Sequence, residues 1–304
     1  MNRRKYDVAV IGGGPAGYTP ALSCARNGYS VAVVEKLSAG GQMASADRID
    51  NYPGFENGID GFELGERMQR GAARFGAVTL FEEVTNVSLS GENKTIFTNI
   101  GEISARTVVL ATGAEPRELG LKDEKELVGR GVAYCATCDG MRYKGKTVVV
   151  AGGGNSAVAD ALYLAKICKK VYLVHRRDSL RASKVYTVPL SESGVEILWN
   201  SRIEEILHDK KVTGVRISDV RSGAETILDC DALFVAVGRK PETEMFGNSV
   251  ELDSAGYIVA DESTKTSLPG VFAAGDVRTK SVRQIATAIA DGAVAAHFIE
   301  EYLL

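Results

Sequence analysis

Short apolar runs, each followed by glycine and then by a longer mixed segment, recur along this chain. The first run covers residues 6–11, glycines occupy 12–14, a helical pattern continues to about residue 27, and residues 29–35 form a second apolar run. Short runs closed by turn signals are typical of buried strands, and the longer segment is typical of a helix. The pattern therefore predicts the order strand, glycine turn, helix, strand.

A second copy of this pattern covers residues 147–174. The spacing between the copies is constant, so that Gly12 corresponds to Gly152 and Gly17 corresponds to Ala157. A single glycine-rich turn is a weak signal, but two copies that both lie between a strand and a helix are hard to dismiss. They predict an α/β protein with two Rossmann-like nucleotide-binding domains.

Each position of the glycine motif has a physical role in binding a dinucleotide. The first glycine makes the turn, the second lets the pyrophosphate approach the backbone, and the third position lets helix and strand pack closely. The pyrophosphate then meets unpaired amides at a helix N-terminus. The predicted cofactor-binding residues are Gly12, Gly14 and Gly17 in the first copy, and Gly152, Gly154, Asn155, Ser156 and Ala157 in the second.

The two copies differ at the end of their second strand, where the adenosine ribose of a dinucleotide lies. Glu35 can accept hydrogen bonds from both ribose hydroxyls and repels a 2′-phosphate, so the first site is predicted to bind FAD or NAD. The second copy has His175, Arg176 and Arg177 at this position, with Arg181 one helical turn further on. Guanidinium groups match phosphate geometry and stay charged, which favours NADPH. A solvated basic strand end is the alternative.

Two further apolar strands end in a small residue and glycine. Residues 108–114 follow the first unit, and residues 233–238 follow the second. We expect them to close the two domains, where the chain passes the bound cofactor, with Gly113 at that point in the first domain. They would also fit the fold as ordinary buried strands.

Composition excludes several classes of protein. The 304 residues include 36 Lys and Arg against 39 Asp and Glu, and a net charge of −3 gives no general attraction to nucleic acid or to anionic membranes. The chain has 33 glycines, whereas an average content of about 7% would give about 21, so many positions need tight turns or close ligand approach. No stretch approaches the roughly 18 apolar residues that span a bilayer. We expect neither a nucleic-acid nor a membrane partner.

Five cysteines are an awkward number for a secreted disulfide framework, so we expect a reducing, cytoplasmic location. The spacing of Cys135 and Cys138 brings their sulfurs within bonding reach. Half of a zinc site is the alternative, but no second such pair exists and the other cysteines and histidines are scattered, so no metal site is predicted. Beside two dinucleotide sites, the pair is interpreted as a dithiol that cycles through a disulfide. The other three cysteines are expected to be packing residues.

Asp139 follows the second cysteine of the pair directly. It could transfer a proton as thiolates form and leave, since general acid–base catalysis requires a group within hydrogen-bond reach. It could equally be a turn or N-cap aspartate, which is common. The spacing alone leaves both interpretations open.

Nine short segments spread over the chain form a more specific set. They are GGGPAG at 12–17, GGQM at 40–43, NYPG at 51–54, ATGA at 111–114, GRGV at 129–132, CATCDG at 135–140, GGGNSA at 152–157, HRR at 175–177 and GDV at 275–277. With these segments the sequence resembles the low-molecular-weight thioredoxin reductases over essentially its whole length. The resemblance implies an FAD domain of residues 1–116 and 245–304, with an NADPH domain of residues 117–244, which carries the redox pair, inserted into it.

The resemblance also implies roles for individual residues. Cys138 is the sulfur nearest the flavin, Cys135 attacks the disulfide of the partner, and Asp139 is the acid–base group. Asp276 contacts the ribityl chain of FAD, although its sequence context also suits a turn. The other residues placed along FAD are Glu35, Gln42, Asn51, Gly275, Arg283, Gln284 and Ile285, and those that bind the 2′-phosphate of NADPH are Arg176, Arg177 and Arg181.

The implied activity is NADPH-dependent reduction of thioredoxin or a thioredoxin-like protein by a homodimer. Nicotinamide and the disulfide must both reach the flavin, yet both belong to the inserted domain. We therefore expect this domain to rotate about the crossings near residues 115–118 and 243–247. A cross-link that fixes one orientation is expected to leave one half-reaction, and survival of both would refute the rotation.

Some positions depart from the family pattern. Pro20 lies inside the first predicted helix, where it removes an amide donor and is expected to kink the helix. Met141 and Arg142 stand where the family commonly has two aromatics thought to meet the partner, which leaves the identity of the partner open. Arg130 and Arg74 are further candidate partner contacts, and by default each is a surface charge.

Three other functions stay open from the sequence. A flavin-dependent dithiol oxidase passes electrons to oxygen, and a ferredoxin-fed thioredoxin reductase does not need NADPH. Both are disfavoured by the intact second glycine motif with Arg176 and Arg177. A non-catalytic nucleotide sensor is disfavoured because sensing would not need the paired cysteines.

Overall fold

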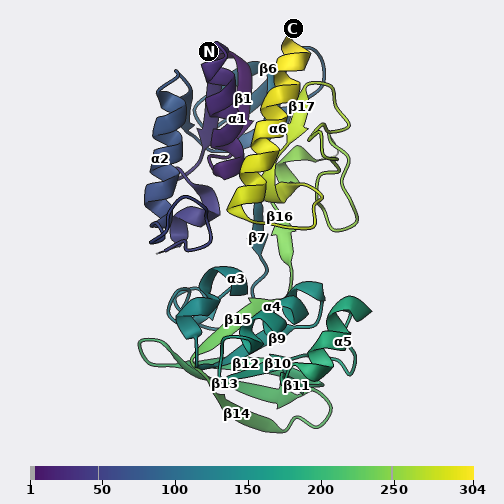
Figure 1. Cartoon of the computed structure of the whole chain (residues 1–304). Helices are drawn as coiled ribbons and strands as arrows, with labels where there is room; N and C mark the ends of the chain where they lie inside the picture. Colours follow the sequence, from purple (N-terminus) through teal and green to yellow (C-terminus); the bar gives the residue numbers. More distant parts are fainter. Residues whose placement is uncertain (1–3, 47, 248) are drawn as a thin grey trace. The chain divides into compact units, whose positions relative to one another are not determined.

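The computed structural model describes residues 4–46, 48–247 and 249–304 of the protein (Figure 1). The chain divides into two compact units. Unit 1 comprises Met1–Glu115 and Lys240–Leu304, and unit 2 comprises Pro116–Arg239. Unit 2 is thus an insertion in the chain of unit 1. The sequence predicts the corresponding boundaries after residues 116 and 244.

Unit 1 is built on a seven-stranded sheet. Its strands are β1 (Arg4–Ile11), β2 (Val31–Glu35), β3 (Val78–Phe81), β4 (Val84–Ser88), β5 (Lys94–Thr98), β6 (Glu102–Leu110) and β17 (Val271–Ala273). Strands β3, β2, β1, β6 and β17 are parallel in that order. The first half of β6 also pairs with β5, which pairs with β4, and both of these contacts are antiparallel. The long strand β6 therefore joins the parallel sheet to an antiparallel extension.

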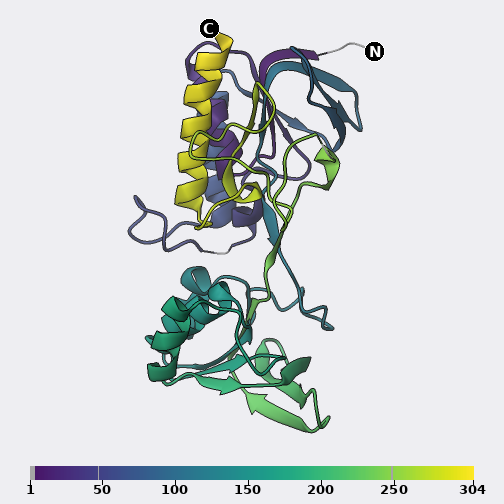
Figure 2. The same ribbon diagram turned by 90° about the vertical axis from the view of Figure 1, so that its right-hand side faces the viewer.

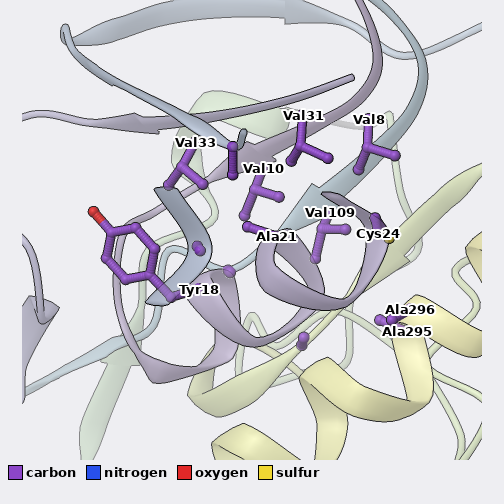
Figure 3. Packing of buried hydrophobic residues seen from close by; sticks show 14 of the residues in the cluster. Val8, Val10, Tyr18, Ala21, Cys24, Val31, Val33, Val109, Ala295 and Ala296 are labelled. Carbon is purple, nitrogen blue, oxygen red and sulfur yellow. The ribbon is translucent and has the colours of Figure 1, made fainter. Parts of the chain in front are cut away.

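Two helices lie side by side over one face of this sheet, α1 (Pro15–Arg26) and α6 (Ile285–Leu303) (Figures 1 and 2). The core on this face includes valines from three parallel strands, small residues from both helices and a few larger side chains such as Tyr18 of α1 (Figure 3). The labelled members include Val10, Val33 and Val109 from the strands, Ala21 from α1 and Ala295 from α6. Small side chains let the helices pack closely on the sheet and on each other.

The first helix remains continuous through Pro20. Pro20 has no amide that could donate to the carbonyl of Ala16. A Cβ atom added to Gly292 of α6 would lie 2.9 Å from that carbonyl oxygen and 2.8 Å from Cδ of Pro20. Because Gly292 has no side chain, α6 packs directly on the turn of α1 that contains the proline.

The remaining helical segments of unit 1 are α2 (Gly61–Ala73), η1 (Gly41–Ser45), η3 (Glu244–Phe246) and η4 (Gly275–Val277). The N-cap of α2 is Asp60, whose carboxylate accepts a hydrogen bond from the amide of Glu63. Glycines at 61 and 65 let α2 approach η1, because a Cβ at either position would lie within 3.0 Å of backbone atoms of residues 39–43. No helix in the described part of the chain has the length and apolar character of a membrane span.

Unit 2 repeats the parallel part of this architecture, but its antiparallel strands form a separate sheet. Its parallel sheet has the order β11 (Glu196–Leu198), β10 (Lys170–Val174), β9 (Thr147–Gly152), β15 (Ala232–Ala236) and β8 (Val132–Ala133). Its antiparallel sheet consists of β12 (Ser201–His208), β13 (Val212–Asp219) and β14 (Glu225–Asp229). Its helical segments are α3 (Ala136–Asp139), η2 (Gly140–Tyr143), α4 (Asn155–Ala165) and α5 (Lys184–Glu192).

The two parallel sheets confirm the predicted fold class. Strands β1, β2 and β6 of unit 1 correspond to β9, β10 and β15 of unit 2, so the two predicted closing strands do pair with the first strand of their units. The outer strand beyond the closing strand differs in its place in the chain. In unit 1 it is β17, the last strand, whereas in unit 2 it is β8, which precedes the glycine motif.

The chain passes between the units twice, in β7 (Ala114–Pro116) and in β16 (Arg239–Pro241). These two strands pair with each other. Just inside unit 2, the amide of Arg117 donates to the carbonyl of Gly238 at 2.9 Å. Both crossings therefore belong to one hydrogen-bonded ribbon.

Candidate active site

The first glycine motif forms a loop whose two sides differ in the space around them. Gly12 has φ +108°, and a Cβ there would lie within 3.0 Å of the carbonyl of Ala111 in the neighbouring strand end. A Cβ on Gly17 would likewise meet the carbonyl of Gly12. At Gly14, in contrast, the nearest atom to an added Cβ is 3.9 Å away. The loop is closed against the sheet and open at the helix N-terminus, which fits a bound pyrophosphate.

The second motif repeats this arrangement. A Cβ on Gly152 would lie within 3.0 Å of the carbonyl of Ala236, and nothing lies within 4 Å of a Cβ on Gly154. Asn155 and Ser156 are exposed at the start of α4, and Ala157 is fully buried. The amide oxygen of Asn155 accepts a hydrogen bond from the amide of Ser183 at 2.9 Å. Both loops therefore have the shape that a dinucleotide phosphate needs.

Glu35 and His175 occupy equivalent positions in the two units. Each contacts the second of the three consecutive glycines, which is Gly13 in unit 1 and Gly153 in unit 2. The carboxylate of Glu35 accepts hydrogen bonds from the amides of Gly13 at 2.8 Å and Leu37 at 3.0 Å. The ring of His175 packs over Gly153, where an added Cβ would lie within 3.0 Å of ring atoms. Burial lowers the pKa of His175. The sequence pattern predicts that His175 contacts the nucleotide together with the arginines. In the structure its ring is buried and packs against the backbone of the glycine loop.

Three arginines surround the second loop and leave their guanidinium groups in solvent. Arg176 and Arg177 directly follow the buried His175, and the backbone amide of Arg181 donates to the carbonyl of Gly153 at 2.8 Å. None of the three forms an ion pair with another residue that the structure describes. Exposed guanidinium groups without an ion-pair partner, beside a glycine loop, suit the binding of a phosphate group.

Half-buried Asp160 on α4 provides a test of the electrostatics of unit 2. Burial raises the pKa of this carboxyl to about 7, and the charge of Arg239 opposes the shift. An ordinary aspartate has a pKa of 3.8, so between pH 3.8 and about 7 the folded protein retains a proton that the unfolded chain has released. The free energy of unfolding therefore falls as the pH rises through this window.

We expect the Asp160→Asn protein to lose this part of the pH dependence. At pH 8 it should be more stable than the natural protein by about 4 kcal/mol, and near pH 4 the two should be similar. Denaturant unfolding across this pH range measures the difference, with exposed Asp178→Asn as the control in the same unit. An equal stability difference at both pH values would contradict the assignment.

Gln42 and Asn51 lie on the loop between β2 and α2, and each has a partner elsewhere in unit 1. The side-chain amide of Gln42 donates to the carbonyl of Ala114 at 2.6 Å, next to Gly113. The side-chain amide of Asn51 donates to the side-chain oxygen of Gln284 at 3.1 Å. Gln284 is the N-cap of α6, so these contacts bring together three segments distant in the sequence.

The turn before α6 carries the other predicted FAD residues. Gly275 has φ +82°, and a Cβ there would lie 2.6 Å from the Cβ of Ala16 in α1, which brings this turn against the first glycine loop. Arg283 donates to the carbonyls of residues 276, 278 and 280, and its guanidinium lies 4.1 Å from the ring centre of Tyr257. Arg283 therefore holds the turn that contains Asp276. Ile285, the first residue of α6, packs against a small apolar cluster of Met43, Ile49, Ile59 and Leu64.

A buried charge cluster behind this turn was not predicted. Asp291 of α6 accepts hydrogen bonds from the amide of Gly275, from Arg278 at two positions and from Lys280, all between 2.7 and 3.0 Å. These contacts lower the pKa of Asp291, although its burial opposes the shift. A signal was available in the sequence, since Asp291 is the one charged residue among the apolar and small residues of 285–299.

The paired cysteines form a disulfide in unit 2. Cys135 and Cys138 are joined at their sulfurs, with their Cα atoms 5.3 Å apart, and Cys138 is the more exposed of the two. Their exposure thus does not by itself identify the attacking sulfur.

The redox motif packs closely on unit 2. Ala136 is fully buried between the two cysteines, and Gly140 lets the motif pack on α4, because a Cβ there would lie 2.9 Å from Tyr163. The amide of Asp139 donates to the carbonyl of Cys135 at 3.0 Å.

The other three cysteines are poorly suited to redox chemistry. Burial raises the pKa of Cys24 and of Cys230 to about 12 and that of Cys168 to about 11. Thiols with such pKa values hold little thiolate at neutral pH. Among the residues that the structure describes, no group of three histidine, cysteine or carboxylate side chains could hold a metal ion.

The chain matches the model of the pyridine nucleotide-disulphide oxidoreductase family over residues 6–292. It is 44% identical to a thioredoxin reductase of Listeria monocytogenes over 300 residues, which cover 98% of this chain and 94% of the relative. It is 41% identical to a thioredoxin reductase of Bacillus subtilis, with coverages of 98% and 95%.

Solved structures give the same result for the fold. A thioredoxin reductase of Streptococcus pyogenes matches with a TM-score of 0.91 at 40% identity and 99% coverage of both chains. One of Giardia duodenalis matches with a TM-score of 0.91 at 37% identity and the same coverages. This chain therefore belongs to the pyridine nucleotide-disulphide oxidoreductases and, within them, to the low-molecular-weight thioredoxin reductases.

Proposed function

We propose that this protein is an NADPH-dependent flavoprotein that reduces the disulfide of thioredoxin or of a thioredoxin-like protein, and that it acts as a homodimer. The observation that carries the proposal is the disulfide between Cys135 and Cys138, formed in the same unit as a phosphate loop surrounded by exposed arginines. Family membership supports the activity, because the relatives are thioredoxin reductases.

FAD is proposed to bind unit 1. The open face at Gly14, the carboxylate of Glu35 and the turn at Gly275 and Asp276 would hold it, with Gln42, Asn51, Gly113, Arg283, Gln284 and Ile285 supporting the segments around it. When bound, FAD supplies a two-electron carrier between a hydride donor and a disulfide. The protein contributes the amides of the loop, which favour the negative charge of the pyrophosphate, and a carboxylate for the ribose.

NADPH is proposed to bind unit 2 through its glycine loop and the guanidinium groups of Arg176, Arg177 and Arg181. His175 keeps the loop in shape from its buried position under Gly153. A 2′-phosphate carries the charge that distinguishes NADPH from NADH, so the arginines are proposed to set the preference for NADPH.

The chemistry of the reduced cysteine pair follows from thiol–disulfide exchange. The thiolate of one cysteine, proposed to be Cys135, attacks a sulfur of the partner disulfide and releases the other partner sulfur as a thiolate. The thiol of Cys138 then loses its proton and attacks Cys135 in the mixed disulfide, which re-forms the Cys135–Cys138 bond and leaves the partner as a dithiol. Asp139 is proposed to accept and return the protons that these steps move.

Steady-state kinetics distinguish the proposed activity from its alternatives. The purified yellow protein is mixed with NADPH and thioredoxin in the absence of oxygen, and NADPH oxidation is recorded. Oxidation that depends on thioredoxin supports the proposal. If NADPH is not consumed and a small dithiol is instead oxidised once oxygen is admitted, the result would favour the oxidase. Activity only with reduced ferredoxin would favour the ferredoxin-fed enzyme. A monomeric mass in solution would contradict the proposed dimer.

Replacing Arg176 with alanine tests the assignment of the phosphate site. We expect the Kd for NADPH to rise by roughly tenfold to a hundredfold, because a charge-assisted hydrogen bond to phosphate is worth about 1.5–3 kcal/mol. The Kd for NADH should change little. Arg202→Ala, which removes an exposed arginine of β12, is the control. Equal losses for both nucleotides would discredit the assignment.

A further inference from the structure

A buried carboxylate in unit 2 takes no part in the chemistry described so far. Glu124 is 1% exposed and forms no ion pair with a residue that the structure describes. Its oxygens accept hydrogen bonds from the amides of Leu119 at 3.0 Å, Gly120 at 2.9 Å and Leu121 at 3.2 Å, and from the hydroxyl of Tyr134 at 2.9 Å. A buried charge is costly unless it is fully hydrogen-bonded, and these four donors meet that need.

The carboxylate fixes a loop that the backbone does not favour by itself. Gly120 has φ +77°, and Asp123 has φ +62°, which is unusual for a residue other than glycine. Left-handed residues of this kind persist where the surrounding contacts determine the conformation. Here the three amides that point at Glu124 supply those contacts.

The four donors to Glu124 come from two segments with different roles. Residues 119–121 follow closely on β7, in which the chain enters unit 2. Tyr134 is the residue directly before Cys135 of the redox pair. Glu124 thus connects the start of unit 2 with the redox pair through hydrogen bonds, and burial together with Glu124 raises the pKa of the Tyr134 phenol.

The position of Cys135 depends strongly on Tyr134. Strand β8 ends at Ala133 in the sheet, and α3 begins at the fully buried Ala136. Only Tyr134 and Cys135 lie between these two anchored points. The carbonyl of Cys135 accepts from the amides of Cys138 and Asp139 within the redox motif itself. The hydroxyl of Tyr134 adds a side-chain contact that joins this short connection to Glu124.

We propose that Glu124, acting through Tyr134, is a positioning residue for the redox pair: it holds Cys135 in the geometry of thiol–disulfide exchange and ties it to the entry segment of unit 2. The part of this inference that concerns exchange rests on the proposed function. The hydrogen-bonded connection between the two segments does not.

Hydrogen–deuterium exchange of the intact protein with its bound cofactor tests the connection. In the Glu124→Gln protein, one carboxylate oxygen becomes an NH2 group that cannot accept from these donors, and the bonds to the remaining oxygen lose the carboxylate charge. Amides of residues 117–121 and also those of 134–139 should therefore exchange at least about tenfold faster. In Tyr134→Phe, a milder variant, only residues 134–139 should change. The control is Asp219→Asn, which removes a carboxylate that accepts from the amides of Arg221 and Ser222 in another turn of the same unit. Faster exchange confined to residues 117–124 in Glu124→Gln would overturn the inference.

The rate of thiol–disulfide exchange tests the functional part. The reduced protein is mixed with 5,5′-dithiobis(2-nitrobenzoate), and the release of its chromophore is followed. We expect this reaction to be about tenfold slower in Glu124→Gln and slower by a smaller factor in Tyr134→Phe, while flavin reduction by NADPH stays at the natural rate. Natural rates in both variants would overturn the positioning role. If the natural protein itself fails to reduce thioredoxin, the proposed function fails, and the hydrogen-exchange result still decides the connection.

Discussion

The Cys138→Ser protein is expected to lose disulfide turnover by at least about a thousandfold and to keep the reduction of its flavin by NADPH. A single remaining thiol at Cys135 can attack a disulfide, but no second thiol of the pair can resolve the mixed disulfide. Reduction of the flavin by NADPH and reduction of the partner disulfide can therefore be measured separately in this variant. The measurements are thioredoxin-dependent NADPH oxidation and anaerobic bleaching of the flavin absorbance.

The control for this variant is Cys168→Ser, in the same unit. Burial raises the pKa of Cys168, and its thiol donates to the carbonyl of Tyr143, so we expect this substitution to leave turnover unchanged. Persistent turnover in Cys138→Ser would remove this cysteine from its role. Loss of turnover in Cys168→Ser would show that the pair does not act alone.

The Gly17→Ala protein is expected to bind FAD at least about a hundredfold more weakly and to be less stable by about 2 kcal/mol. Gly17 lies inside α1, where alanine would gain up to about 1 kcal/mol in helix propensity. An added Cβ, however, would lie within 3.0 Å of the carbonyl of Gly12, and backbone atoms at such a site cannot move aside cheaply. The helix must shift away from the strand, which displaces the phosphate loop.

Flavin absorbance of the purified protein and calorimetric unfolding measure the two effects. Gly101→Ala in the same unit is the matched control, because no atom lies within 4 Å of its added Cβ. In the second glycine motif the position equivalent to Gly17 is Ala157, so a Cβ atom is already present there. A yellow Gly17→Ala protein of natural stability would contradict the close helix–strand approach assigned to this glycine.

The repeat in the sequence was sufficient to predict the core of both units. Its helices were expected to end near residues 27 and 167, and α1 and α4 end at Arg26 and Ala165. The signals were strong because a buried parallel strand must be apolar throughout, and because the first glycine adopts a conformation that other residues rarely adopt. The disulfide at Cys135 and Cys138 was likewise predicted from spacing and is present in the structure.

Other features could not be recognised from local patterns. Strand β8 has two residues, Val132 and Ala133, and its place beside β15 depends on pairing with a strand a hundred positions away in the chain. The edge strands β4 and β14 of the antiparallel parts are largely exposed, so their apolar signal is weak. Pro20 is accommodated because Gly292, in a different part of the sequence, leaves room beside it.

The candidate site shows the same division. Residue type and spacing were enough to predict the glycine loops, Glu35 and the arginines as dinucleotide contacts, because each has a direct chemical reason to be one. The structure adds the groups that hold these residues in place. Asp291 accepts a hydrogen bond from Gly275, His175 packs against Gly153, and Glu124 accepts a hydrogen bond from Tyr134, next to the redox pair. Such supporting contacts join segments that are distant in the sequence, so a local sequence pattern cannot predict them.

A thiol count during anaerobic reduction tests the central claim most directly. The oxidised protein with its flavin is titrated with NADPH, denatured in the presence of a thiol reagent, and compared with the same protein before titration. We predict that bleaching of the flavin is accompanied by the appearance of two new thiols per chain, at Cys135 and Cys138. Bleaching without new thiols, or new thiols at other cysteines, would contradict the path of electrons from NADPH through FAD to this disulfide.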